Sequence, residues 1–266
     1  MVLVTDSSAC LPPALFYHAN VRVVPIRILL PNRSVKETPE SIEEIYSALT
    51  AAGQVTSAPP TLLEYLESIE DDAFDEALVL SPATEFAGMH RVATMAASLS
   101  GRSVEVVDTR SVAAGQCLVV AAALEAVVAG ASAAEGAEVA RLAASRTELV
   151  AAMAELGSMR HAGAGAPAGA AAPRRGHPLV RLRDGAVQPL PDPASDGGEL
   201  GGLEAAWLAS GGPQADETVV FHGASQPRAH ELCALLGVVA EIVALSPALA
   251  LQMGVGCVGA AWRRKA

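Results

Sequence analysis

Hydroxyl side chains recur at the ends of several segments of this 266-residue chain. They follow short apolar runs that are typical of buried strands, or they precede stretches with helical periodicity. In an open α/β sheet, ligands bind beyond the carboxyl ends of the strands, where hydroxyl groups and helix-start amides can hold an anion. The pattern therefore indicates a carboxylate site. The hydroxyl residues concerned are Ser7, Ser8, Thr56, Ser57, Thr84 and Ser111.

A glycine-rich stretch, GVGCVG at residues 254–259, matches the spacing of the dinucleotide-binding fingerprint. That fingerprint requires a strand before it, a helix after it and an acidic residue about twenty positions further on. Only residues 260–266 follow, which leaves no place for the helix and the acidic residue. We expect these glycines to form a tight turn with a close backbone approach instead.

The sequence contains no complete catalytic constellation. It has no Gly-x-Ser-x-Gly elbow and no phosphate-binding loop that ends in Gly-Lys-Ser or Gly-Lys-Thr. His90 follows a helix start and His222 ends a strand, where either could act as a general base, but neither has a nucleophile at a recognised spacing. We expect a protein that is not an enzyme. A small acyl hydrolase remains a third alternative, with His90 as its base and one of three nucleophiles: Ser7, Ser8 or Ser57.

The four cysteines are too scattered to form a zinc motif. We therefore expect free thiols in a reducing cytoplasm, and neither a metal ion nor a cofactor. The cysteines are Cys10, Cys117, Cys233 and Cys257.

Charge and composition disfavour two classes of partner. The net charge of −11 disfavours nucleic acid and anionic membrane surfaces, and an aromatic content of only 3% disfavours stacking on bases. The longest apolar segment, residues 112–134, is interrupted by Gln116 and Glu125. This segment predicts a buried helix rather than a membrane span, so we expect no stable membrane insertion.

In the first half of the chain, predicted strands alternate with predicted helices, which is typical of a doubly wound α/β layer with a parallel sheet. Pro25 marks an edge or a bulge in the second strand. The predicted strands are residues 2–5, 21–30, 77–81 and 104–108, and residues 53–60 form a loop. The predicted helices are residues 12–20, 39–52, 61–69, 86–98, 115–129 and 134–145.

The second half of the chain predicts a smaller α+β domain. Asp184 and Gly185 separate two apolar runs and give a strong hairpin signal. Residues 162–176 are of low complexity, and residues 191–202 are a polar loop rich in glycine and proline. We place the boundary near Arg146, which gives domains of residues 1–146 and 147–266. The predicted strands are residues 149–153, 179–183, 187–190, 218–222, 238–245 and 257–262, with a helix at 227–236.

Seven stretches in order resemble the motifs of one family. They are TDSSACLPP, VRVVPIRILL, VTSAPP, LSPATEFAGMHRVA, VEVVDTRSVAAGQCLVV, HPLVRLRDGAVQPL and SPALALQMGVGCVGAAW. The sequence resembles the DegV family of bacterial fatty-acid-binding proteins over nearly its whole length. The resemblance implies two α/β-type domains with a lipid tunnel between them. It also implies a fatty acid ligand, whose carboxylate is presented to a separate fatty acid kinase.

The resemblance assigns ligand-binding roles by position. Thr56 and Ser57 match the family's Thr-Ser loop, and Ser7 lies in the opening turn that borders the ligand head. Thr84 and Gly88 match two positions of the family's Ser-Gly turn.

Two further residues of the implied site differ from the family pattern, and a third lies near a position that differs. Ala87 lies in the Ser-Gly turn where the family has serine, and Gln252 stands where the family often has histidine. Arg160 matches a basic pair, but a later family arginine is Ala164 here. These departures keep a second hypothesis open, a degenerate member with an altered or lost ligand that acts as a binding or scaffold protein.

Overall fold

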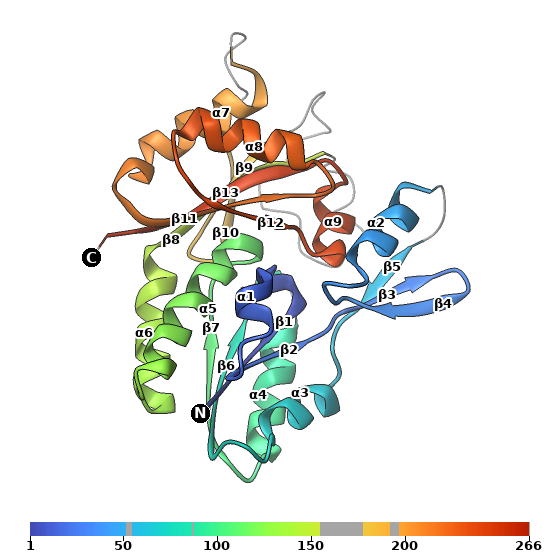
Figure 1. Cartoon of the computed structure of the whole chain (residues 1–266), viewed down its shortest axis with the longest axis vertical. Coiled ribbons are helices and arrows are strands. Elements are labelled where there is room, and N and C mark those ends of the chain that lie inside the picture. Colours follow the sequence, from blue (N-terminus) through green and yellow to red (C-terminus); the bar gives the residue numbers. More distant parts are fainter. Residues whose placement is uncertain (52–54, 87, 155–177, 192–196, 266) are drawn as a thin grey trace.

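The computed structural model describes residues 1–51, 55–86, 88–154, 178–191 and 197–265. Within these residues the chain forms an α/β fold with two main sheets, one in the lower half of Figure 1 and one in the upper half. A third, smaller sheet lies at the right of the same view. The low-complexity segment 162–176 lies outside the described residues.

The first main sheet is parallel, with the strand order β2-β1-β6-β7. Alternate residues of a strand face opposite sides of the sheet. Val2 and Val4 of β1 pack against α3 and α4, whereas Leu3 between them packs against α5 and α6. Helices thus cover both faces, which confirms the predicted doubly wound layer. The strands are β1 (Val2–Asp6), β2 (Val21–Val24), β6 (Glu76–Ser81) and β7 (Ser103–Asp108), and the helices are α3 (Leu62–Ile69), α4 (Met89–Leu99), α5 (Ala113–Val128) and α6 (Ala133–Arg146).

The second main sheet is mixed, with the strand order β10-β9-β8-β13-β11-β12. Helices α7 and α8 cover one face, above the sheet in Figure 1. The other face packs against α5, which therefore lies between the two main sheets. This separate sheet confirms the predicted α+β half of the fold. The strands are β8 (Thr147–Ala152), β9 (Leu179–Arg183), β10 (Ala186–Pro189), β11 (Ala215–His222), β12 (Glu241–Ala244) and β13 (Val258–Arg264), and the helices are α7 (Gly198–Ala209) and α8 (Gln226–Leu236).

The small antiparallel sheet belongs to the N-terminal part of the chain but packs against a helix from the C-terminal part. Its strands are β4 (Arg33–Lys36), β3 (Arg27–Leu30) and β5 (Thr56–Ala58), in that order. Ile28 of β3 packs with Ile45 of α2 (Ile42–Thr50) and with Ala248 of α9 (Pro247–Met253). A helix from the C-terminal region therefore completes the core around this N-terminal sheet.

Helix α5 is apolar on almost every side because it is enclosed by both main sheets. Its buried residues come from the long apolar segment of the sequence, as predicted. None of the helices in the described part of the chain has the length and apolar character that crossing a membrane requires.

Several expectations of local structure are wrong. Residues 21–30 form two strands in different sheets, since Pro25 has no N–H to donate to a ladder. The loop expected at 53–60 contains β5, which pairs with β3. The helix expected at 12–20 covers only α1 (Pro13–Phe16), because Val21 bonds back to His18 in a turn. Helix α7 begins within the loop expected at 191–202. Its glycines disfavour a helix, but Leu203 and Trp207 anchor it on the second sheet.

Two turn predictions are confirmed. Asp184 and Gly185 have φ values of 50° and 75°, as the short hairpin between β9 and β10 requires. The first part of the stretch at 254–259 forms a tight turn, with φ of 87° at Gly254 and 96° at Gly256, and its last two residues begin β13. Gly259 lies so close to the next strand that an added Cβ would be 2.3 Å from the carbonyl oxygen of Val150.

Candidate functional site

A cavity of about 320 Å³ lies where the loop after β6 and the start of α4 meet β5 and α9. We call it the polar cavity. Ser57 of β5, Thr84 and Gly88 of the loop after β6, and Gln252 of α9 line it. These four residues were predicted to bind a ligand, and the fold brings them together from three separate segments of the chain.

Of the other four predicted site residues, two lie elsewhere and two lie outside the described residues. Thr56 precedes Ser57 on β5, so its side chain faces the opposite side of the strand, and it is not among the described residues that line the polar cavity. Ser7 lines a different cleft, described below. Ala87 and Arg160 lie outside the described residues, as does Ala164.

Two side chains of the polar cavity are available to a ligand. Within the described part of the chain, the Ser57 hydroxyl and the Gln252 side-chain amide have no hydrogen-bond partner. Gly88 is the N-cap residue of α4 and has no side chain that could cap this helix. The first backbone amides of a helix lack intrahelical partners, and together with the helix dipole they favour an anion. The cavity thus combines neutral donors that suit a carboxylate.

The remaining polar groups around this cavity are engaged. The Thr84 hydroxyl donates to Asp108 Oδ2 over 2.7 Å, and the Thr84 backbone N–H points to the same oxygen at 3.3 Å. Glu85, which also lines the cavity, forms an ion pair with Arg110 at 3.6 Å. Two acids against the one arginine leave a net negative charge near the loop, so a bound anion would depend on the hydroxyl, the amide and the helix end.

The opening turn is a buried polar network. Asp6 accepts a hydrogen bond from the backbone N–H of Ser8 at 3.0 Å and another from the Ser8 hydroxyl. Gln116 of α5 donates to Asp6 at 3.4 Å and to Thr5 at 3.1 Å. Burial of Asp6 raises its pKa to about 6, against the opposing effect of the Ser8 hydrogen bonds. The turn therefore fixes Ser7 and Ser8 between β1 and α5.

Glu37 is a second buried acid, and no feature of the sequence marked it as a site residue. It lies between β4 and α2, and only 2% of its surface is exposed. Its carboxylate accepts hydrogen bonds from Ser7 Oγ at 2.5 Å, Ser246 Oγ at 2.9 Å and the Ala248 N–H at 2.5 Å. Burial of the carboxylate raises the pKa of Glu37 to about 7. The acid thus joins the opening turn to the start of α9.

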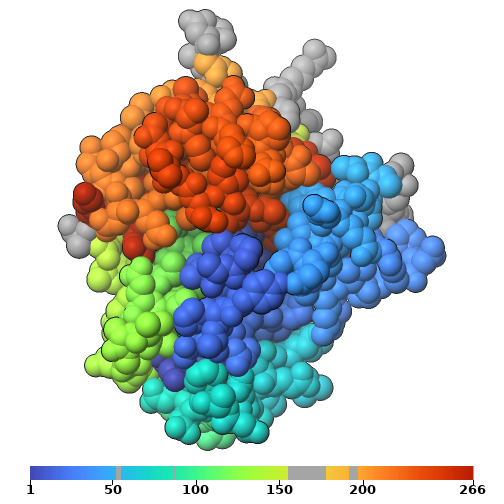
Figure 2. Space-filling view, viewed as in Figure 1, coloured from blue at the N-terminus to red at the C-terminus, as the bar shows by residue number. Residues whose placement is uncertain are grey.

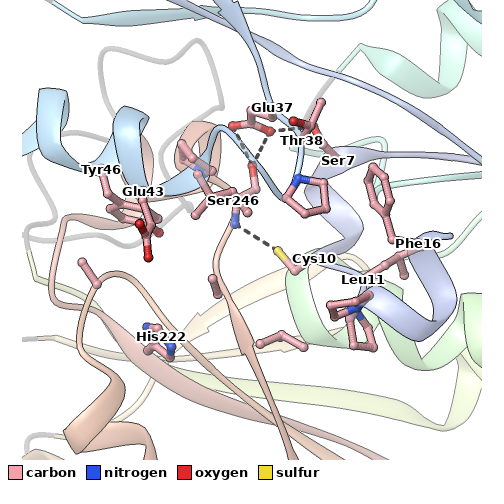
Figure 3. Close-up of a pocket in the computed structure, with 18 of the residues that line it drawn as sticks. Ser7, Cys10, Leu11, Phe16, Glu37, Thr38, Glu43, Tyr46, His222 and Ser246 are labelled. Atoms are coloured by element: carbon pink, nitrogen blue, oxygen red, sulfur yellow. Dashed lines mark hydrogen bonds between the residues drawn. The ribbon is translucent and has the colours of Figure 1, made fainter.

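A second hollow, of about 610 Å³, lies on the other side of Glu37. We call it the apolar cleft. Three chain segments meet around it, the dark blue opening turn with α1, the lighter blue α2 and the orange-red region around β12 (Figure 2). Leu11, Phe16 and Ile42 are among its apolar walls, and Figure 3 shows Glu37 and Ser246 together at one side of it.

The charged groups of the apolar cleft are acidic. Glu37 and the exposed Glu43 line it, and no lysine or arginine is among the described lining residues. His222 also lines the cleft, and its burial lowers its pKa, so it is neutral at pH 7. Tyr46 closes one side and donates its hydroxyl to the carbonyl oxygen of Leu245 at 2.8 Å. The cleft suits an apolar chain and repels a carboxylate.

The serine and histidine pairs of the hydrolase alternative do not form. His90 Nδ1 lies 2.9 Å from the hydroxyl of Ser81, a fully buried residue, and not beside any of the three proposed nucleophiles. The Ser7 hydroxyl is bonded to Glu37 and the Ser8 hydroxyl to Asp6. The described residues contain no group of three or more histidine, cysteine, aspartate or glutamate side chains that could hold a metal ion.

Comparison with known families gives the wider context. Residues 1–176 match the family model described as "Uncharacterised protein, DegV family". The chain belongs to the DegV family. The match covers more than half of the sequence, from the opening turn through the first main sheet and into the second.

Several known proteins are similar to this chain over almost their whole length. A DegV domain-containing protein of Mycobacterium tuberculosis is 27% identical, over 97% of this chain and 95% of its own. A stearic acid-binding protein from Eubacterium ventriosum shares the fold with a TM-score of 0.86 and 17% identity, over 100% of this chain and 99% of its own. A fatty acid binding DegV protein from Streptococcus agalactiae has a TM-score of 0.83 and 21% identity, over 100% of this chain and 99% of its own.

Proposed function

We propose that this DegV protein binds a long-chain fatty acid and holds its carboxylate in the polar cavity. The observation that carries the proposal is the meeting of Ser57, Gly88 and Gln252, which supplies a hydroxyl, a helix end and an amide at one point. Hydrogen bonds to a charged group each contribute about 1.5–3 kcal/mol. The fatty-acid-binding DegV proteins of the same fold support this choice of ligand.

The acyl chain would supply most of the affinity. Each buried methylene contributes about 0.8 kcal/mol, so a long chain outweighs the loss of one or two polar contacts at the head. Phe86, Val112 and Leu249 line the polar cavity beside the hydroxyl residues and belong to or pack against the core between the two main sheets. The ligand can therefore pass from polar to apolar surroundings within a short distance.

The proposal includes a role as a carrier. Thr84 and Gly88 are exposed, so a carboxylate bound beside them stays accessible from solvent. A separate fatty acid kinase would then transfer a phosphoryl group from ATP to that carboxylate. The protein itself would perform no chemistry, and its four free cysteines suit a reducing cytoplasm. A kinase assay with the loaded protein, followed by detection of the acyl phosphate, tests this step.

The experiment that tests the proposal is native mass spectrometry of freshly purified protein, followed by solvent extraction and lipid analysis. We expect one fatty acid per chain. A protein that carries no lipid, and that also fails to take up added fatty acids, would contradict the proposal. That result would favour the second hypothesis, a DegV protein whose ligand has changed, for which Gln252 and the acidic Glu85 in the cavity are the motivating features.

A further inference from the structure

A single wall separates the polar cavity from the apolar cleft. In the opening turn, Ser8 lines the cavity and Ser7 lines the cleft. At the start of α9, Ala248 lines the cavity and Pro247 lines the cleft. Because neighbouring residues of two different segments face opposite compartments, the two hollows are separated by little more than the thickness of the backbone and one layer of side chains.

The Glu37 side chain joins the parts of this wall. Its carboxylate accepts hydrogen bonds from Ser7, Ser246 and the N–H of Ala248, which come from the opening turn and from α9. Its backbone N–H donates to the carbonyl oxygen of Ile26 at 2.9 Å, and the Ile26 N–H donates to Ser7 Oγ at 2.9 Å. Ile26 itself lines the polar cavity, so these bonds close the wall from both sides.

An acid is an unexpected residue at such a position. Burial of a carboxylate beside the apolar cleft costs free energy, which a leucine or valine would avoid. Since burial raises its pKa to about 7, the carboxylate gains a proton readily near neutral pH, which lowers the cost of leaving its donors.

We propose that Glu37 determines the length of the acyl chain that the protein accepts. The inference rests on the proposed function, because it requires the ligand carboxylate to lie beside Ser57 and Gln252. A short chain ends within the polar cavity, on one side of the wall. A longer chain reaches the apolar cleft only when the Glu37 side chain leaves Ser7 and Ser246.

The test is a binding titration with saturated fatty acids lengthened by two carbons at a time. For the unaltered protein, we expect the affinity to rise about fourfold per methylene while the chain fills the polar cavity. At one chain length, which we call the break length, the end of the acyl chain meets Glu37. There the gain in affinity per methylene falls well below fourfold. Glu37→Ala opens the wall, so its break length moves to longer acids by at least one step of the series.

Two control variants isolate the effect. Glu37→Gln keeps the size of the side chain and, like the protonated acid, carries no charge, so we expect the break length that the unaltered protein has at a pH below the pKa of Glu37. Glu43→Ala removes an exposed acid of the same cleft that is not part of the wall, and it should also leave the break length unchanged. An identical break length in Glu37→Ala and the unaltered protein would overturn the inference but leave the proposed function intact. Failure of every protein to bind any acid would overturn the proposed function itself.

A further variant keeps the inference testable if Glu37→Ala does not fold. Ile42 of α2 is half-buried and lines the apolar cleft, away from the polar cavity. Ile42→Trp partly fills the cleft, so it should weaken acids longer than the break length by about fourfold or more and leave shorter acids unchanged. Equal effects on short and long acids, or none on either, would show that acyl chains do not enter the cleft.

Discussion

The hydroxyl of Thr84 donates to the carboxylate of Asp108 over 2.7 Å and thereby joins the loop after β6 to the end of β7. A hydroxyl group has one proton to donate. While this bond lasts, Thr84 offers only acceptor lone pairs to the polar cavity. Its hydroxyl and its position in the family's Ser-Gly turn made Thr84 a candidate donor to a ligand carboxylate, but in this conformation it donates its proton to Asp108.

The first prediction concerns Thr84→Val, which keeps the shape of the side chain and removes its hydroxyl. We expect a loss of about 1 kcal/mol in the free energy of unfolding, because the hydrogen bond that disappears is exposed to solvent and therefore weaker than a buried bond to an acid. We expect fatty acid affinity to change less than twofold. Denaturant titration and fatty acid titration measure the two effects. A tenfold loss of affinity would show that the hydroxyl turns from Asp108 to the ligand upon binding.

The second prediction separates the adjacent residues Ser57 and Thr56. Ser57 lines the polar cavity and has no partner within the described residues, whereas the side chain of Thr56 faces the other side of β5. Ser57→Ala should weaken fatty acid binding by about tenfold or more, since a hydrogen bond to a carboxylate contributes about 1.5–3 kcal/mol. Thr56→Ala is the matched control, and its affinity should stay within about twofold of the unaltered protein.

Two results would contradict this prediction for the Ser57→Ala and Thr56→Ala variants. If Thr56→Ala weakened binding as much as Ser57→Ala, both hydroxyls would contact the ligand, and β5 would have to rearrange. If neither variant changed the affinity, the carboxylate would not lie in the polar cavity.

Most of the fold could be predicted from the sequence because its elements are strongly patterned. Most residues of Val2–Asp6 and of α5 are apolar and buried, so local composition is enough to predict these two elements. Helix α7 and strand β5 were missed for the opposite reason. The glycines of α7 and the short TSA segment of β5 have weak local preferences, and contacts with distant parts of the chain stabilise them.

The candidate site shows the same division. Ser57, Thr84 and Gln252 were found because motifs with known spacing surround them. Glu37 was missed because its neighbours suggest an ordinary polar loop before a helix. Its partner Ser246 is 209 positions away in the sequence, so the buried carboxylate is created only when α9 packs beside the opening turn. A single sequence offers no local pattern for such a contact.

The third prediction concerns stability as a function of pH. Burial raises the pKa of Glu37 from 4.5 to about 7, so between these values the folded protein holds a proton that the unfolded chain has released. Stability therefore falls as pH rises through this window, by up to about 3 kcal/mol from this group. Asp6 acts in the same direction, since its pKa is raised from 3.8 to about 6.

Glu37→Gln tests this contribution because glutamine is similar in shape and does not titrate. Denaturant unfolding at a series of pH values from 4.5 to 8 should show a smaller loss of stability in the variant, with the contribution of Asp6 retained. Glu43→Gln, which removes an exposed acid of the apolar cleft, should follow the unaltered protein. A variant of Glu37 with the full pH dependence of the unaltered protein would show that this acid does not hold a proton in the folded state.

The last prediction concerns Gly259, the final glycine of the stretch that resembles a dinucleotide fingerprint. Gly259 lies in β13, where an added Cβ would be 2.3 Å from the carbonyl oxygen of Val150 and 2.4 Å from the ring of Phe221. Gly259→Ala should destabilise the protein by about 1–3 kcal/mol, because neither the ladder nor the buried ring can move aside freely. Gly101→Ala is the matched control, since no atom lies within 4 Å of its added Cβ. Denaturant unfolding of both variants measures the difference, and equal stabilities would mean that β13 shifts to accept the methyl group.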